Sequence, residues 1–114
     1  MKRKVLPLVV LSGLLSFAAC ARPLASGALT AGVAAALIED WDEAVRQWTA
    51  ALERDPRSAA AHNNLAVAFE RKGAWEEARR EYETAFRLEP DNPTVRQNFE
   101  AFKVRVASGR AGSP

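Results

Sequence analysis

Apolar and polar positions recur along this chain with a period of 34 residues. The stretch from Trp41 to Pro56 reads WDEAVRQWTAALERDP, and the stretch from Trp75 to Pro90 reads WEEARREYETAFRLEP. A fixed period of roughly 20 to 50 residues marks a repeat protein, in which each helix-turn-helix unit buries its apolar face by stacking on its neighbours. The pattern therefore predicts an all-α fold of antiparallel helix-turn-helix repeats, an α-solenoid.

Local signals divide the chain into helices. Asp40, Ser58 and Asn92 each precede a stretch of helical period, and residues of these types favour helix N-caps. Glu43 follows Asp40 by three residues and is expected to complete a capping box. Gly73 can supply a tight turn. The predicted helices cover residues 26–37, 41–54, 58–72, 75–88 and 93–106.

The last predicted helix has the pattern of a terminal cap. One face carries an apolar stripe, made of Val95, Phe99, Phe102 and Val106. The outer face carries Arg96, Gln97, Glu100 and Lys103. Terminal repeats need such a polar outer face for solubility. We therefore expect about two repeat units, a C-terminal capping helix over 93–106 and a flexible tail over 107–114.

The first residues have the pattern of an export signal. A basic start, from Lys2 to Lys4, precedes an apolar run over 5–19 that ends in small residues before the only cysteine, Cys20. The run has 15 residues, fewer than the roughly 20 that a membrane-spanning helix needs. We predict a signal peptide over 1–19 and a short tether over 20–24.

The four residues from Phe17 to Cys20 resemble the lipobox of bacterial lipoproteins, although that family usually has Leu where Phe17 stands. The resemblance implies lipidation at Cys20 and an anchor in the bacterial cell envelope. Ala21 follows the cysteine where Asp favours the inner membrane, so the resemblance favours the periplasmic face of the outer membrane. Cleavage after Ala21, an uncleaved segment and an inert Cys20 are the alternatives.

Charge and composition argue against several classes of function. The net charge is +2, and loss of the three basic residues at positions 2–4 with the signal makes it −1. The remaining basic residues form no stripe of the kind that binds nucleic acid. One cysteine cannot form an internal disulfide, and the only histidine, His62, has no nucleophile, phosphate loop or metal-ligand cluster beside it. We expect no enzyme activity, cofactor, metal or nucleic-acid partner.

Acidic and basic residues also recur at helical spacing. Three acid-then-base pairs stand four residues apart: Asp42 and Arg46, Glu76 and Arg80, and Glu83 and Arg87. Such pairs stabilise a helix by roughly 0.2–0.5 kcal/mol each. We interpret them as solvent-exposed helix faces.

The repeats resemble the tetratricopeptide repeat (TPR) family. In the copy over residues 59–92, the family's characteristic positions hold Leu65, Ala66, Phe69, Gly73, Trp75, Ala78, Tyr82, Ala85 and Pro90. The copy over 25–58 keeps the pattern in its second helix but has alanines in its first, so it is a degenerate unit. The resemblance implies a scaffold that binds a protein or peptide. Large residues at Trp41, Trp48, Trp75 and Tyr82 are expected in the core between helix pairs.

In this family the first helix of each unit lines a concave groove. The resemblance places there Asn63, Asn64, Val67, Glu70, Arg71, Thr94, Gln97, Asn98, Ala101 and Arg105. Asn64 and Asn98 lie one repeat apart, as do Arg71 and Arg105. A side-chain amide can bind a peptide backbone and Arg can bind a carboxylate, so a peptide ligand is chemically plausible. The alternative is that the amides serve helix packing and the arginines solubility.

The uncharged stretch over 23–38 has two interpretations, a packed first helix or a tether that leaves Trp48 partly uncovered. Because two units and a cap fall short of the usual three repeats, marginal stability or self-association through an apolar face near Ala28 to Leu37 is expected. The sequence favours a lipid-anchored envelope adaptor that holds a partner in its groove. The alternative is a structural subunit that self-associates through exposed repeat ends and forms a homo-oligomer.

Overall fold

The computed structural model describes residues 25–109, which contain five helices and no strand. The helices are α2 (Ala25–Leu37), α3 (Trp41–Arg54), α4 (Ala59–Arg71), α5 (Trp75–Leu88) and α6 (Pro93–Ala107). The predicted all-α repeat fold is confirmed, and each helix begins and ends within one residue of its expected bounds. The predicted signal peptide over 1–19, Cys20 and the rest of the tether lie outside the described residues, as do residues 110–114 of the tail.

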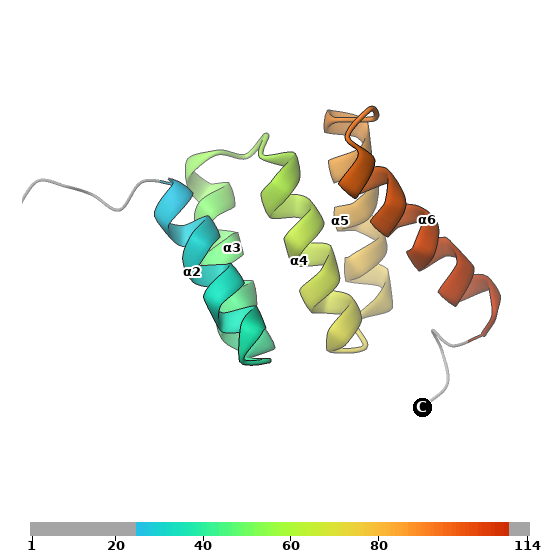
Figure 1. Ribbon diagram of the computed structural model, residues 1–114, viewed down its shortest axis with the longest axis horizontal. Coiled ribbons are helices and arrows are strands. Elements are labelled where there is room, and N and C mark those ends of the chain that lie inside the picture. The colour runs from blue at the N-terminus through green and yellow to red at the C-terminus, as the bar shows by residue number, and fades with distance from the viewer. Residues whose placement is uncertain (1–24, 110–114) are drawn as a thin grey trace, which may run out of the picture.

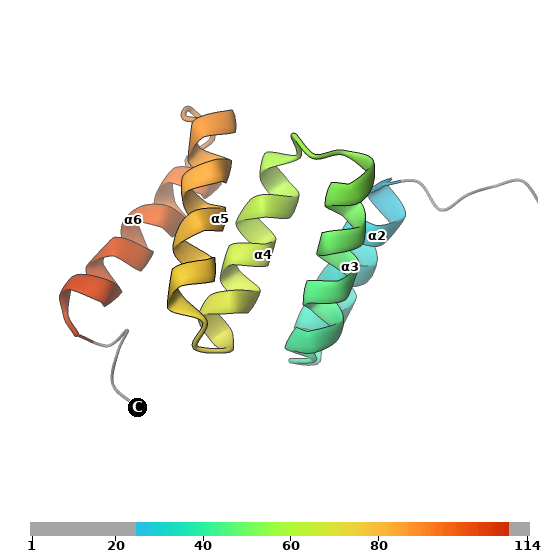
Figure 2. The same ribbon diagram turned by 180° about the vertical axis from the view of Figure 1, so that it is seen from behind.

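The helices form two rows. Helices α2, α4 and α6 lie on one face of the stack, and α3 and α5 lie on the other (Figures 1 and 2). Consecutive helices pack on one another from α2 to α5, α5 packs on α6, and α4 also contacts α6. The row of α2, α4 and α6 therefore presents the face on which the sequence predicts a groove.

The helix starts follow from the capping residues. The side chain of Asp40 accepts a hydrogen bond from the Glu43 amide at 3.0 Å, and Ser58 accepts one from the Ala61 amide at 3.1 Å. Asn92 accepts from the Thr94 amide at 3.0 Å, with Pro93 at the first helical position. These bonds satisfy amides that have no partner within the helix.

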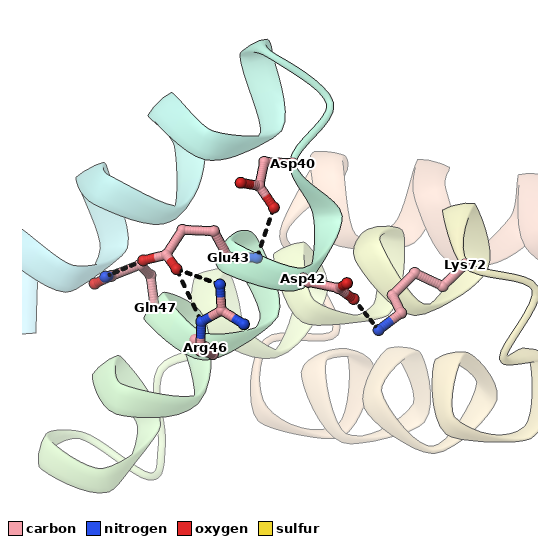
Figure 3. Close-up of polar contacts among 6 residues, drawn as sticks. All are labelled: Asp40, Asp42, Glu43, Arg46, Gln47 and Lys72. Atoms are coloured by element: carbon pink, nitrogen blue, oxygen red, sulfur yellow. Dashed lines mark hydrogen bonds and ion pairs between the residues drawn. The ribbon is translucent and has the colours of Figure 1, made fainter.

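One part of the expected capping box is wrong. The carboxylate of Glu43 binds the side chains of Arg46 and Gln47 instead of returning to the Asp40 amide (Figure 3). The Asp40 amide donates to the carbonyl of Ala35 instead. That carbonyl belongs to the end of α2, so the turn into α3 removes the need for a capping box.

The first helix pair buries Trp48 against α2. The Trp48 side chain is 3 % exposed, and its Nε1 donates to the Leu29 carbonyl at 3.1 Å. Gly32 permits this approach, because a Cβ there would lie 2.3 Å from Nε1 of Trp48. The segment from Ala25 is therefore a packed helix, and the tether interpretation is wrong for it.

The second helix pair is closed by α6. Tyr82 and Phe102 are buried, with ring centroids 5.1 Å apart, and Ala66 and Ala78 complete the core. Val95 is also buried, and the polar residues of the predicted outer face are exposed. The apolar stripe and polar outer face of α6 are thus as expected. The small Ala78 lets α5 approach its neighbours closely.

The expected acid–base pairs do not form within the described residues. Asp42 reaches across to Lys72 at the end of α4, and Arg46 pairs with Glu43 at 2.6 Å (Figure 3). Glu76 lies 3.8 Å from Arg79, and Arg87 donates to Thr84. The spacing rule missed these partners because neighbouring turns and helices offer closer ones.

Candidate partner-binding groove

A pocket of ≈ 500 Å³ opens between α4, α5 and α6. Its lining consists of Val67, Glu70, Arg71, Trp75, Tyr82, Asn98 and Arg105. Five of these seven residues belong to the groove predicted from the sequence. Helix geometry brings them together, because positions 67, 70 and 71 share one face of α4 and positions 98 and 105 share one face of α6.

Two lining residues were not expected there. Trp75 and Tyr82 come from α5, and the sequence placed both in the core between helix pairs. Tyr82 is buried, but Trp75 is only half-buried and contributes to the pocket wall. Their spacing of seven residues, two turns of one helix face, was the available signal.

Glu70 is held inside the pocket by two donors. The Tyr82 hydroxyl donates to its Oε2 at 2.9 Å, and Nε of Arg105 donates to its Oε1. Burial raises the pKa of Tyr82, and the Glu70 carboxylate adds to the rise. The hydrogen bond to Glu70 likewise raises the pKa of Arg105. The three side chains therefore form one linked group that joins α4, α5 and α6.

The predicted asparagines form a chain of amide hydrogen bonds across α4 and α6. Nδ2 of Asn98 donates to Oδ1 of Asn63 at 3.2 Å, and Nδ2 of Asn63 donates to Oδ1 of Asn64 at 3.4 Å. Asn63 is 5 % exposed, so it links the two helices from within the packing. Asn64 and Asn98 remain partly exposed.

The other residues predicted for the groove are Arg71 of α4 and three residues of α6. Arg71 is exposed, and its guanidinium lies 5.3 Å from the centroid of the Trp41 ring. Gln97 and Thr94 are exposed and Ala101 is partly buried, and none of the three lines the pocket. Of the predicted residues, the pocket thus gathers those in the C-terminal half of α4 and two of those on α6, Asn98 and Arg105.

His62 has a structural position. Its Nδ1 lies 2.6 Å from the Glu81 carboxylate, and its Nε2 lies 2.9 Å from the Pro56 carbonyl oxygen. These contacts join α4 to α5 and to the loop before α4. Within residues 25–109 no three His, Cys, Asp or Glu side chains form a group that could hold a metal ion.

The comparison with known families decides the class of protein. The family model of the tetratricopeptide repeat matches residues 29–93, more than half of the chain. The chain belongs to the tetratricopeptide repeat family. A search of curated proteins gave no match. Repeats of this family generally mediate protein–protein interactions and are typically not enzymes.

The described helices of this TPR protein are short. Across residues 25–109, none combines the length and apolar character that a bilayer crossing requires.

Proposed function

We propose that this TPR protein is an interaction adaptor that holds a protein or peptide partner in the groove between α4 and α6. The pocket of ≈ 500 Å³ carries the proposal, because it combines amide, guanidinium and aromatic groups on one face of a packed scaffold. An extended peptide needs donors and acceptors for its backbone, and partly exposed Asn98 provides a side-chain amide in the pocket.

Crosslinking in native membranes tests the groove. A photoreactive residue in place of Val67, which lines the pocket from α4, should capture a discrete partner when the full-length protein is expressed at its natural level. Charge reversal by Arg71→Glu should weaken this capture and leave the oligomeric state unchanged. Arg105 is a poorer site, because its reversal would place a second carboxylate beside Glu70. Unchanged capture by Arg71→Glu would contradict the groove assignment.

We further infer that the adaptor is anchored to the bacterial envelope through a lipid on Cys20. The support is sequence alone: a basic start, an apolar run and small residues before the only cysteine. Multiple acyl chains would provide stable anchoring. Metabolic labelling with a fatty-acid analogue should mark the wild type and not Cys20→Ala, and an equal label on both would refute lipidation. Density fractionation would then separate the favoured outer membrane from the inner one.

A second candidate function is a structural subunit that self-associates through its N-terminal repeat end. Leu37 at the end of α2 and Ile38 in the turn after it are 80 % and 77 % exposed, and Val33 of α2 is 42 % exposed. Uncharged α2 would bring no charge repulsion to a contact between two copies. Analytical ultracentrifugation of the wild type and a Leu37→Ser, Ile38→Ser variant decides this point. A wild-type dimer that dissociates in the variant favours the structural subunit.

A further inference from the structure

The groove contains one cation that no neighbouring carboxylate neutralises. Glu70 is bonded to Arg105, so those two charges offset each other within the pocket. Lys72, the next residue after Arg71, is paired with Asp42. Within residues 25–109 no ion pair involves Arg71, although it lines the same pocket. The pocket therefore has a net positive charge located at Arg71.

The position of Arg71 suits it to bind a carboxylate. Its guanidinium lies over the Trp41 ring, with 5.3 Å between the central carbon and the ring centroid. A guanidinium on an aromatic face keeps its N–H groups available at the edge, where they can bind a carboxylate through two parallel hydrogen bonds. The ring also limits the rotamers of Arg71, which lowers the entropy lost when a ligand binds.

Apolar surface adjoins this cation. Val67 lies one helical turn before Arg71, and half-buried Trp75 begins the next helix. Both line the pocket, whose volume of ≈ 500 Å³ lies within the roughly 300–1,000 Å³ typical of ligand pockets. A ligand that consisted only of a charged group would leave the Val67 and Trp75 side chains in contact with water.

We propose that the pocket recognises an Asp or Glu side chain within an extended segment of the partner, next to an apolar residue. The carboxylate accepts hydrogen bonds from Arg71, and the apolar neighbour covers Val67 and Trp75. This specificity rests on the proposed adaptor function and names the chemistry of its partner. The single unpaired guanidinium matches the single charge of a carboxylate, whereas a doubly charged phosphate would leave one negative charge without a partner in the pocket.

Two blocked heptapeptides provide the test, one with the central sequence Leu-Asp-Leu and one with Leu-Asn-Leu. Each is titrated into the full-length protein while the backbone amide signals of α4 and α6 are followed by NMR. The Asp peptide should bind about tenfold more tightly at low salt, as expected for a charge-assisted hydrogen bond at a partly exposed site. High salt should reduce the difference.

Arg71→Gln should abolish the preference for Asp while weak binding of both peptides persists. Arg80→Gln is the matched control, because it removes the same charge from an exposed position on α5 that does not line the pocket. It should keep the full preference. Circular dichroism of both variants should match that of the wild type, since both arginines are exposed.

Three outcomes would overturn the inference. Equal affinity for the two peptides at the groove would remove the acidic specificity and leave the adaptor function standing. Absence of groove shifts with either peptide would refute this recognition, while crosslinking at position 67 would still judge the adaptor function independently. Tighter binding of a Leu-phosphoserine-Leu peptide would assign the site to phosphate instead.

Discussion

The two helix pairs of this protein place different neighbours around the same aromatic position. Trp48 in α3 and Tyr82 in α5 lie 34 residues apart and are both buried. Trp48 packs against Gly32 and donates to a backbone carbonyl of α2, whereas Tyr82 packs against Phe102 and donates to the side chain of Glu70. The second helix of each repeat thus keeps its buried aromatic residue. The residues that this aromatic contacts differ between the two helix pairs.

The groove-facing helices α2 and α4 differ in charge at matching positions of the repeat. Leu37 of α2 corresponds to Arg71 of α4, and Ala36 corresponds to Glu70, each one repeat apart. The first pair therefore has an uncharged surface where the second has an acid–base group and a free cation. The degenerate first unit therefore lacks the charged groove residues of the second unit but keeps a buried aromatic residue between its two helices.

The largest test of this comparison is Gly32→Ala. Alanine in a helix interior is ordinarily about 0.8–1.0 kcal/mol more favourable than glycine. Here a Cβ would lie 2.3 Å from Nε1 of Trp48, so we expect destabilisation by roughly 1–3 kcal/mol from overpacking. Urea denaturation measures it. The reciprocal change at the matching position, Ala66→Gly, should also destabilise. A more stable Gly32→Ala protein would show that α2 is not tightly packed on Trp48.

Tyr82→Phe tests the hydrogen bond that distinguishes Tyr82 of the second helix pair from Trp48 of the first. Loss of the hydroxyl that donates to partly buried Glu70 should destabilise the protein by about 1–2 kcal/mol at neutral pH. The folded protein raises the pKa of Tyr82 above its ordinary value. Its contribution is therefore complete below pH about 10 and is lost as the pH rises further, because the unfolded chain then releases that proton more readily.

The stability difference between the wild type and Tyr82→Phe should therefore shrink above pH about 10. Urea midpoints measured at several pH values give this difference, and both proteins share every other titrating group. Tyr82 is the only tyrosine in the chain, so tyrosinate absorbance reports its ionisation directly. An ordinary titration midpoint in the folded protein would contradict the buried contact with Glu70.

A smaller effect is expected at the turns that end α2 and α4. Glu39 has a φ of 60°, and Gly73, one repeat later, has a φ of 76°. Glycine adopts this left-handed conformation without the steric cost that a side chain adds. Glu39→Gly should therefore stabilise the protein by about 0.5–1 kcal/mol, and Gly73→Ala should destabilise it by a similar amount. Thermal denaturation compares the pair, and equal signs would contradict the correspondence of the two turns.

The smallest effect concerns the surface contact between the two helix pairs. The hydrogen bond from Lys72 holds the pKa of Asp42 below its ordinary value. This contribution is present above the pKa of the unfolded carboxyl and is lost as the pH falls through the lower folded value. Asp42→Asn should lower the stability of the folded protein slightly at pH 7 in low salt and leave it unchanged at pH 2. Denaturation midpoints at the two pH values measure this. An equal difference in stability between the wild type and Asp42→Asn at both pH values would show that the charge of Asp42 is not its cause.

Sequence patterns predicted the elements well because their causes are local. Asp40, Ser58 and Asn92 cap helices through bonds that span two or three residues, and the apolar stripe of α6 follows from helical period alone. The pocket was partly predictable, since the repeat relates the groove positions of α4 to those of α6.

The rest depends on contacts between distant residues. Glu70 meets Arg105 at a separation of 35 residues, and Lys72 meets Asp42 at a separation of 30. No periodicity within one helix specifies such partners. The role of Gly32 was hidden for the same reason, because the space that it leaves is filled by a side chain from the next helix.

The polar outer face of α6 disfavours one way in which two copies of the stack could meet. Joining the exposed apolar end at α2 to the α6 end of another copy would bury charged residues such as Arg96 and Lys103, which is unfavourable without partners. Copies that met through the apolar end at α2 would therefore pair like ends, about a two-fold axis. Such a contact closes on itself. Among the residues that the structure describes, the two ends of the stack therefore favour a closed pair over a growing head-to-tail filament.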